Sequence, residues 1–337
     1  MTEPDNDSIE RKVKAAAADP FFLDRVFTPY AHSRREKLYP KFAGYAQFVH
    51  YTSADAALKI LKDKRFWLRN TSCMGDYREV QHGFETLQRA LGQEKNFDRL
   101  TEALNFVSPG LAQESFGLFD QWWAHIQTNT YIGCLSEHDV SENEHGRLSM
   151  WRAFGGATAR VGVVLDVPWY SGGIAELNLI FSPVAYFGEG QVRSELAVVI
   201  HNIRENVDVL QHVGREAVLR CVANMLMTAV TCMKHEGFLE EREWRVLCNP
   251  IMWPSTLVQR STQSIAGVPQ VIYEMPLDSA VSIKLSELDV SKLISRVIIG
   301  PTQYGAAVKG AFIEAMAAAG VPNPESRVCT SGIPIRP

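Results

Sequence analysis

The chain has 337 residues, of which 46% are hydrophobic and 21% charged, so it has an ordinary globular composition and room for a large core. A formal net charge of -4 excludes the overall basic character of many nucleic-acid binders, although a local basic groove stays open. The six cysteines are scattered and form no C-x-x-C pair, which favours reduced thiols over a disulfide framework or a zinc site. Met1 to Ala18 lacks the apolar core of a signal peptide, and no apolar run approaches the ~18 residues of a membrane span, so we expect a cytoplasmic protein without membrane attachment.

The first part of the chain leads into a strand and a helix. Residues 1–45 mix charges with aromatics, and we expect a helix near Ile9–Ala18 followed by an irregular lead-in without an assigned function. The apolar run at 47–53 predicts a short buried strand, and Ser53 is a suitable N-cap for a helix that continues through Lys62.

Strands and helical stretches are mixed over the rest of the chain. Apolar residues recur at helical spacing over 79–127 and 192–235, and we expect these stretches to be large helical insertions. Shorter helices are expected at 149–155 and 308–319. Short apolar runs predict strands at 65–70, 130–137, 161–166, 180–186, 270–275, 280–285 and 296–299. This mixture predicts an α+β fold.

The segment Phe238–Arg245 concentrates charge in an unusual way. If it is a strand, alternation places Glu241, Glu243 and Arg245 on one face and Trp244 in the core. Two like charges on one face repel, and an arginine beside them offsets the repulsion; such clusters recur where a carboxylate meets a polar ligand. The alternative interpretation is a solvated strand edge that carries an ion pair.

Two other polar stretches follow predicted strands. His50, Tyr51 and Thr52 lie at the end of one strand, where loops often present ligand-binding groups, although a core histidine is the alternative. The loop from Glu137 to His145 contains carboxylates and histidines, but their spacing matches no metal-binding motif, so we expect a mobile polar loop.

Together these stretches resemble a bacterial family that is catalogued as a domain of unknown function (number 2971). The resemblance covers about residue 45 to the C-terminus. The matching pieces, in chain order, are His50-Tyr51-Thr52, Phe66-Trp67-Leu68-Arg69-Asn70, Asp76-x-x-Glu79, Cys134-x-Ser136-Glu137, Ser149-Met150-Trp151-Arg152, Phe238-x-Glu240-Glu241-x-Glu243-Trp244-Arg245, Ile298-Ile299-Gly300-Pro301 and Ser331-x-x-Pro334-x-Arg336.

The order of these motifs is also similar to that of mono-ADP-ribosyltransferases. That superfamily has an Arg or His motif on its first strand, a Ser- or Tyr-bearing strand in the middle and a late catalytic Glu, in some members as Glu-x-Glu. The resemblance implies a split, mixed or mostly antiparallel sheet of ADP-ribosyltransferase type that holds His50, Ser149–Trp151 and Glu243 around one cleft. It also implies NAD as the substrate and no metal.

The resemblance further implies roles for individual residues. Cleavage of the nicotinamide–ribose bond passes through an oxocarbenium-like transition state, whose charge Glu243 would stabilise while Glu241 orients or deprotonates the acceptor. An aromatic face suits nicotinamide, and guanidinium groups suit the pyrophosphate. An alternative role for Arg245 is structural pairing with Glu241. The residues implied for the NAD site are His50, Tyr51, Thr52, Ser149, Trp151, Arg69, Arg152 and Arg245.

Several functional hypotheses stay open at this point. An ADP-ribosyltransferase would modify a nucleic acid, a protein or a small molecule, with toxicity or phage defence as a role by analogy. The same pocket could transfer to water, as an NAD glycohydrolase, or bind a nucleotide or nucleic acid without catalysis. A metal-dependent nuclease would use Asp76, Glu79, Glu137 and His138, but no nuclease spacing is recognisable. The sequence leaves the oligomeric state and any restraining partner open.

The expected domain organisation is one catalytic-type domain after a lead-in. Residues 1–45 form the lead-in, and 46–337 form a single α+β domain with helical insertions at about 79–127 and 192–235. The alternative is two domains that meet near residue 170.

Overall fold

The computed structural model describes residues 6–40, 44–74, 79–153, 159–169 and 176–334. The chain separates into two compact units, and each is assembled from three stretches that are distant in sequence. The helical unit comprises Met1–Lys37, Asp76–Thr128 and Pro183–Gly237. The sheet unit comprises Leu38–Gly75, Asn129–Ser182 and Phe238–Pro337.

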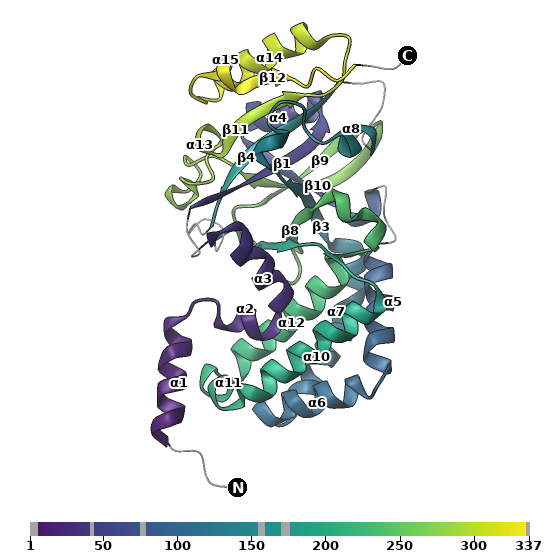
Figure 1. Cartoon of the computed structure of the whole chain (residues 1–337), viewed down its shortest axis with the longest axis vertical. Coiled ribbons are helices and arrows are strands. Elements are labelled where there is room, and N and C mark those ends of the chain that lie inside the picture. Colours follow the sequence, from purple (N-terminus) through teal and green to yellow (C-terminus); the bar gives the residue numbers. More distant parts are fainter. Residues whose placement is uncertain (1–5, 41–43, 75–78, 154–158, 170–175, 335–337) are drawn as a thin grey trace. The chain divides into compact units, whose positions relative to one another are not determined.

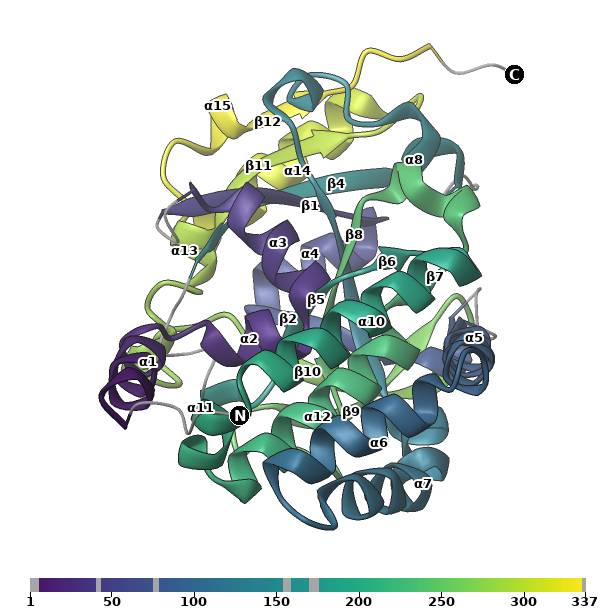
Figure 2. The same ribbon diagram turned by 60° about the horizontal axis from the view of Figure 1, so that its bottom comes forward.

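The helical unit is built around long amphipathic helices. Helix α5 contacts α6, α10 and α12, and α10 also contacts α6 (Figures 1 and 2). Buried aliphatic side chains such as Leu100, Ile203 and Val222 form the packed interior. A two-stranded parallel ladder, β6 with β7, completes the unit. Its elements are α1 (Asn6–Ala18), α2 (Phe22–Phe27), α3 (Pro29–Leu38), α5 (Glu79–Gly92), α6 (Asn96–Val107), α7 (Leu111–Asn129), β6 (Ala185–Tyr186), α10 (Glu189–Glu205), α11 (Val207–Val213), α12 (Arg215–Thr231) and β7 (Met233–Lys234).

The predicted helices are present, with two differences. The prediction of an irregular lead-in after the first helix is wrong, because helices α2 and α3 follow α1. The helix expected over 192–212 is interrupted at Asn206. The next helix begins at Arg215 as expected, after Gly214, whose φ of 93° is accessible mainly to glycine. The helices predicted as insertions share a unit with residues 1–37, and the chain passes between the two units five times.

The sheet unit contains ten strands in one sheet, counted over the described residues. The strand order is β12-β11-β4-β1-β3-β2-β10-β9, with β8 paired to β3 and β5 paired to β8. Strands β11 and β12 are parallel. The pairs β1–β3, β1–β4, β2–β10, β9–β10, β4–β11, β2–β3 and β3–β8 are antiparallel. The strands are β1 (Tyr45–Ser53), β2 (Arg65–Asn70), β3 (Tyr131–Glu137), β4 (Arg160–Pro168), β5 (Ile180–Pro183), β8 (Glu243–Cys248), β9 (Gln259–Ile265), β10 (Val268–Pro276), β11 (Ile294–Ile299) and β12 (Val328–Thr330).

Helices of the sheet unit cover both faces of this sheet. Helices α4 (Ala54–Asp63) and α14 (Gly305–Ala318) contribute to the main core, which also contains Phe48, Leu165 and Trp244 from the strands. The opposite face carries a smaller cluster against α8 (Leu148–Ala153). Alternating side chains therefore separate a large apolar face from a smaller one that also holds charged residues. Short helices α13 (Val290–Leu293) and α15 (Pro324–Arg327) and the 3₁₀ turns η2 (Thr71–Cys73), η3 (Val140–Glu142), η4 (Glu236–Glu241) and η5 (Ile283–Leu285) complete the described elements.

Most strand predictions are confirmed, but one is wrong and one strand of the sheet edge was missed. The stretch 280–285 is a turn followed by η5, and its apolar side chains Val281 and Ile283 are exposed rather than buried. Strand β9 was not predicted, because it is an edge strand of mostly polar, exposed residues without a core-facing period. The predicted α+β class is confirmed in its coarse form, a mixed sheet with many helices.

One edge of β3 is divided between two strands. Strand β8 pairs with β3 over its length, so β1 and β2 must both use the other edge. Strand β2 pairs with Ile132, and β1 pairs only with Ser136 and Glu137. The two strands therefore separate near the middle of β3, and this split is the feature around which the candidate site is built.

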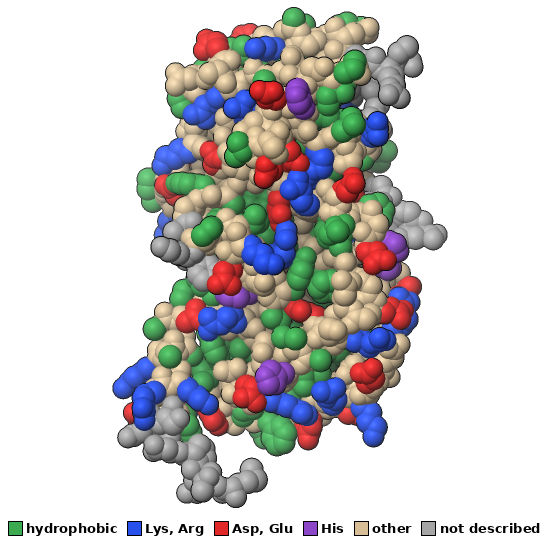
Figure 3. All heavy atoms as spheres, viewed as in Figure 1, with side chains coloured by type: hydrophobic (Ala, Val, Ile, Leu, Met, Phe, Trp, Pro, Cys, Tyr) green, Lys and Arg blue, Asp and Glu red, His purple; other side chains and the backbone are tan. Residues whose placement is uncertain are grey.

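Neither sign of charge dominates the face of the molecule shown in Figure 3. Figure 3 shows acidic and basic side chains interspersed on the visible face. Among the described helices, none is both long and apolar enough to cross a bilayer.

Candidate functional site

The candidate site lies on the face of the sheet to which Glu243 points. Glu243 is directly opposite Ser136 on β3, and Ser136 is directly opposite Val49 on β1. Because paired residues share a face and neighbouring strands lie about 5 Å apart, a carboxylate and a hydroxyl are adjacent there. Both are buried, with 6% of Glu243 and 4% of Ser136 exposed. Ser136 belongs to a matching motif, yet we did not predict it as a site residue.

Glu243 forms a buried ion pair with Arg245 on the same face of β8. The Arg245 Nε donates to Glu243 Oε1 over 2.8 Å, and Nη2 lies 3.3 Å from Oε2. Arg245 is only 2% exposed. The fork of the guanidinium fixes the plane of the carboxylate and balances its charge. The predicted shared face of Glu243 and Arg245 is thus present.

A second arginine lies on this face, on the other side of β3. Arg69 of β2 pairs with Ile132, two residues from Cys134, and Cys134 is directly opposite Arg245. Arg69 Nε donates to the Gln270 side chain over 3.2 Å, and Nη2 donates to the Cys73 carbonyl over 2.9 Å. Burial lowers the pKa of Arg69, while Cys73 and Cys134 oppose that shift. Arg69 and Arg245 therefore flank β3 with two positive charges.

The aromatic residues predicted to hold nicotinamide contact each other instead. The rings of Tyr51 and Trp151 meet edge to face, with centroids 4.8 Å apart, and both side chains are buried. The Tyr51 hydroxyl accepts a hydrogen bond from the Arg147 backbone N–H over 2.8 Å. Trp151 Nε1 donates to the His145 carbonyl over 2.7 Å. Burial raises the pKa of Tyr51, so the phenol stays neutral.

His50 points to the opposite face of the sheet from Glu243. Val49 shares the face of Glu243, and strand alternation turns the next residue away. The His50 ring fills the split in the sheet: Nδ1 lies 2.8 Å from the Cys134 carbonyl, and the ring packs edge to face against Phe66 of β2. Because a carbonyl only accepts, Nδ1 carries the proton. Burial lowers the pKa of His50, opposed by this hydrogen bond.

The remaining predicted residues are placed as follows. The prediction that Glu241 shares the strand face with Glu243 is wrong, because the strand begins only at Glu243 and Glu241 ends the turn η4. The residue between them, Arg242, has a φ of 44°, which breaks the alternation. Ser149 lies on helix α8, which confirms the helix predicted there and differs from the serine-bearing strand of the superfamily. Arg152, on the same helix, is exposed. Thr52 shares the face of His50.

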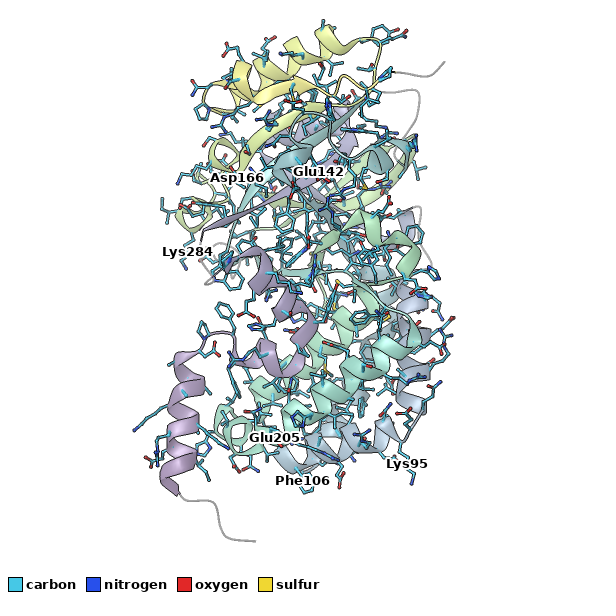
Figure 4. The ribbon with its side chains drawn as sticks, viewed as in Figure 1. Lys95, Phe106, Glu142, Asp166, Glu205 and Lys284 are labelled. Atoms are coloured by element: carbon cyan, nitrogen blue, oxygen red, sulfur yellow. The ribbon has the colours of Figure 1, made fainter. Side chains whose placement is uncertain are left out.

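The loop between β3 and α8 contains two residues that we did not predict. Glu142, labelled in Figure 4, accepts hydrogen bonds from Arg147 through both carboxylate oxygens and from Arg242. Burial disfavours its charged form, but the hydrogen bonds and charge of Arg147 outweigh burial and lower the pKa of Glu142. Arg147 also binds backbone carbonyls of η4. The loop that we predicted to be polar and mobile is polar, and its side chains form hydrogen bonds within the sheet unit.

The histidine and carboxylate groups of this loop form no metal site. His138 is buried, with Nε2 bound to the Asn143 side chain over 3.0 Å, and burial lowers its pKa. Trp244 Nε1 donates to Glu137 Oε1 over 2.9 Å. Over the described ranges, no group of three or more His, Cys, Asp or Glu side chains is arranged to hold a metal ion.

Two of the matching stretches, and the end of one predicted helix, extend beyond the described residues. Asp76, the end of the predicted helix at Gly155, and Arg336 all lie outside the described residues.

On the face opposite Glu243, an apolar cavity of about 60 Å³ is lined by side chains such as Phe66, Leu135 and Val246. It has neither the size nor the polar groups that a dinucleotide needs.

Comparison with known proteins assigns no family to the chain. No protein-family model, curated protein or solved structure matches it. The function must therefore be argued from the residues and their arrangement.

Proposed function

We propose that the sheet unit cleaves the nicotinamide–ribose bond of NAD and transfers ADP-ribose to an acceptor, with Glu243 as the catalytic residue. The observation that carries the proposal is the cross-strand group of Glu243, Ser136 and Arg245, with Arg69 on the same face across β3. It combines a fixed carboxylate, a hydroxyl and two guanidinium groups. This is the set that a ribose and a pyrophosphate require.

The chemistry follows from the charge that develops in the reaction. As the C–N bond breaks, nicotinamide leaves with the electron pair and positive charge develops on the ribose. A carboxylate held by Arg245 requires no reorganisation when that charge appears. The acceptor oxygen or nitrogen then bonds to the ribose carbon and loses its proton. Glu241, half-buried beside the strand, is the carboxylate that we assign to this proton.

The placement of other residues reshapes the proposal. Ser136 replaces Ser149 as the serine beside the catalytic glutamate, because Ser136 lies on the strand that pairs with β8. His50 acts as a structural residue of the split sheet rather than as a ribose ligand. Nicotinamide then needs an aromatic contact other than the face between Tyr51 and Trp151, which contact each other. The experiment below tests whether the acceptor of ADP-ribose is a macromolecule or a small molecule.

A specific observation favours a second candidate. Glu243 is buried and bound on both oxygens by Arg245, an arrangement that also suits a nucleotide-binding module without turnover. In that case Glu243 only orients the guanidinium for a phosphate. The two candidates share the ligand class and differ in whether NAD is consumed.

The deciding experiment uses NAD labelled in its adenylate phosphate, incubated with the full-length protein and a cell extract. Free nicotinamide is measured together with label on protein, DNA or RNA. We compare wild type, Glu243→Gln and the control Glu314→Gln, which alters an exposed glutamate of α14. We expect Glu243→Gln to lower nicotinamide release by about 100-fold or more and the control to leave it unchanged.

Each result identifies one function. Nicotinamide release with label on a macromolecule supports the transferase, and release without label identifies a glycohydrolase. Binding of NAD by the wild type without release of nicotinamide identifies the binding module. Neither binding nor release of NAD contradicts the proposal. Thermal unfolding of each variant shows whether a lost activity reflects a lost fold.

A further inference from the structure

Arg147 uses every donor of its side chain within the sheet unit. Its five N–H groups have five acceptors: Nε donates to Glu142 Oε1 at 3.0 Å, Nη1 to the carbonyls of Glu240 at 2.9 Å and Glu241 at 3.1 Å, and Nη2 to the Glu137 carbonyl at 2.7 Å and to Glu142 Oε2 at 3.1 Å. Its side chain is only 11% exposed. A side chain committed in this way holds its partners in one arrangement.

These acceptors belong to three separate segments. Glu137 is the last residue of β3, Glu142 ends η3, and Glu240 and Glu241 end the turn η4 that leads into β8. The backbone N–H of Arg147 also donates to the Tyr51 hydroxyl, which adds β1. Arg147 thus connects the end of β3, the loop after it and the approach to Glu243.

The turn before Glu243 is one that needs external support. Arg242 adopts a φ of 44°, a backbone conformation that residues other than glycine rarely adopt. The Arg242 carbonyl accepts from the Glu137 N–H over 2.9 Å, and the Arg242 side chain binds Glu142. Arg147 holds the two carbonyls immediately before this residue. The strained backbone therefore lies between Arg147 and the catalytic residue.

We infer that Arg147 is a positioning residue that sets the direction in which Glu243 leaves the turn, so that its carboxylate meets Ser136 and Arg245. This inference rests on the proposed function for its consequence in catalysis, but its structural part can be tested without any activity. Lysine has three donors and no planar fork, so it cannot bind the carbonyls of η4, the end of β3 and both Glu142 oxygens together.

The first measurement is hydrogen exchange of the full-length protein. We compare wild type, Arg147→Lys, and Arg260→Lys as a control for the same change on the exposed edge strand β9. Arg147→Lys is expected to lose about 10-fold or more of the protection of amides 240–244, from the loss of charge-assisted hydrogen bonds. Protection equal to wild type in these amides overturns the inference, whether or not the protein consumes NAD.

The second measurement is the rate of NAD consumption. We expect Arg147→Lys to lower kcat by about 10-fold or more while KM changes by less than about 2-fold, because an orientation and not a substrate contact is lost. Millimolar guanidinium chloride should restore activity to Arg147→Ala, because free guanidinium can replace the lost side-chain group. The same concentration of sodium chloride should not restore it. An unchanged kcat in a variant with a loosened turn overturns the inference, as does a lowered kcat that guanidinium leaves unrestored. If wild type shows no turnover, the proposed function fails, and the exchange result alone decides the role of Arg147.

Discussion

Trp151 shows how closely a single side chain can be enclosed in the sheet unit. Its indole lies between backbone segments that approach too closely for a side chain. A Cβ on Gly146 would lie 2.7 Å from the ring, and one on Gly300 would lie 2.9 Å from it and 3.1 Å from the Arg160 carbonyl. Nε1 of the ring also donates to the His145 carbonyl. Trp151 therefore supports Tyr51 rather than presenting a free face to a ligand.

The close approach at Gly300 gives a residue-scale prediction. Gly300→Ala forces a methyl group into the Trp151 ring and the Arg160 carbonyl, and we expect it to lower the free energy of unfolding by about 1–3 kcal/mol. The matched control is Gly310→Ala in helix α14, where a Cβ meets nothing within 4 Å. There the same change should stabilise the protein by up to ~1 kcal/mol. Urea unfolding of both variants measures the difference, and equal effects would contradict the role of Trp151.

Some of these residues could be predicted from sequence and others could not. The shared face of Glu243 and Arg245 follows from strand alternation, because both are within one regular strand. The structure pairs Arg245 with Glu243, whereas the sequence suggested Glu241 as its partner. Glu241 could not be placed in this way, since the strained Arg242 ends the periodicity one residue before the strand. Arg147 left no periodic signal: three of its side-chain acceptors are backbone carbonyls, which any residue supplies.

At the scale of elements, strand prediction depended on contact with the core. Strands β1, β2, β3, β4, β10 and β11 have buried apolar residues, and the corresponding apolar runs can be recognised in the sequence. Strand β9 pairs only with β10 and stays exposed, so its formation depends on the hairpin rather than on burial. The division of β3 between two partners could not be derived from either strand alone, because it is a property of their registers.

The split at β3 leads to a prediction about pH. Burial lowers the pKa of His50, so the unfolded chain binds its proton more readily than the folded one. The stabilising contribution of neutral His50 is therefore complete above the unfolded pKa of about 6.5 and decreases as the pH falls below it. We expect the free energy of unfolding to decrease between pH 7 and pH 5.

His50→Asn should make that decrease smaller. The asparagine amide places a donor where Nδ1 was, so it can keep the hydrogen bond to Cys134 without titrating. His32 and His138, whose pKa values burial also lowers, leave part of the dependence in place. Urea midpoints measured across this range compare His50→Asn with His201→Asn, an exposed histidine of α10. An identical pH dependence in wild type and His50→Asn contradicts a buried neutral His50.

At the scale of the whole molecule, sequence order and spatial order differ. The sheet unit takes β1–β2, β3–β5 and β8–β12 from three stretches, and the helical unit fills the intervals. A break near residue 170 would separate β4 from β11 and β3 from β8, which are paired neighbours in the sheet. No single composition change along the sequence marks a boundary of this kind, so the organisation could not be read from it.

This interleaving predicts which pieces of the chain can fold. The fragments 1–170 and 171–337 each lack strands that pair with their own, so we expect neither to unfold cooperatively. A chain that joins 38–75, 129–182 and 238–337 through short Gly/Ser linkers should fold, because it keeps the whole sheet and its main apolar core. Short linkers can join the three stretches, because the segments near both joints lie close together. At the first joint the Thr71 N–H binds the Thr130 carbonyl over 3.0 Å, and at the second joint β5 pairs with β8.

Near-ultraviolet circular dichroism and urea titration distinguish these pieces. The joined sheet unit should give a single cooperative transition, since the Trp244, Phe48 and Phe181 rings pack against one another within it. Gly300→Ala should lower its midpoint, as in the full chain, because both contact partners are retained. Cooperative unfolding of 171–337 alone would show that β11 and β12 need no strand from the first half. A joined unit without a transition would show that its core depends on the helical stretches, and the sheet unit would then not be an independent folding unit.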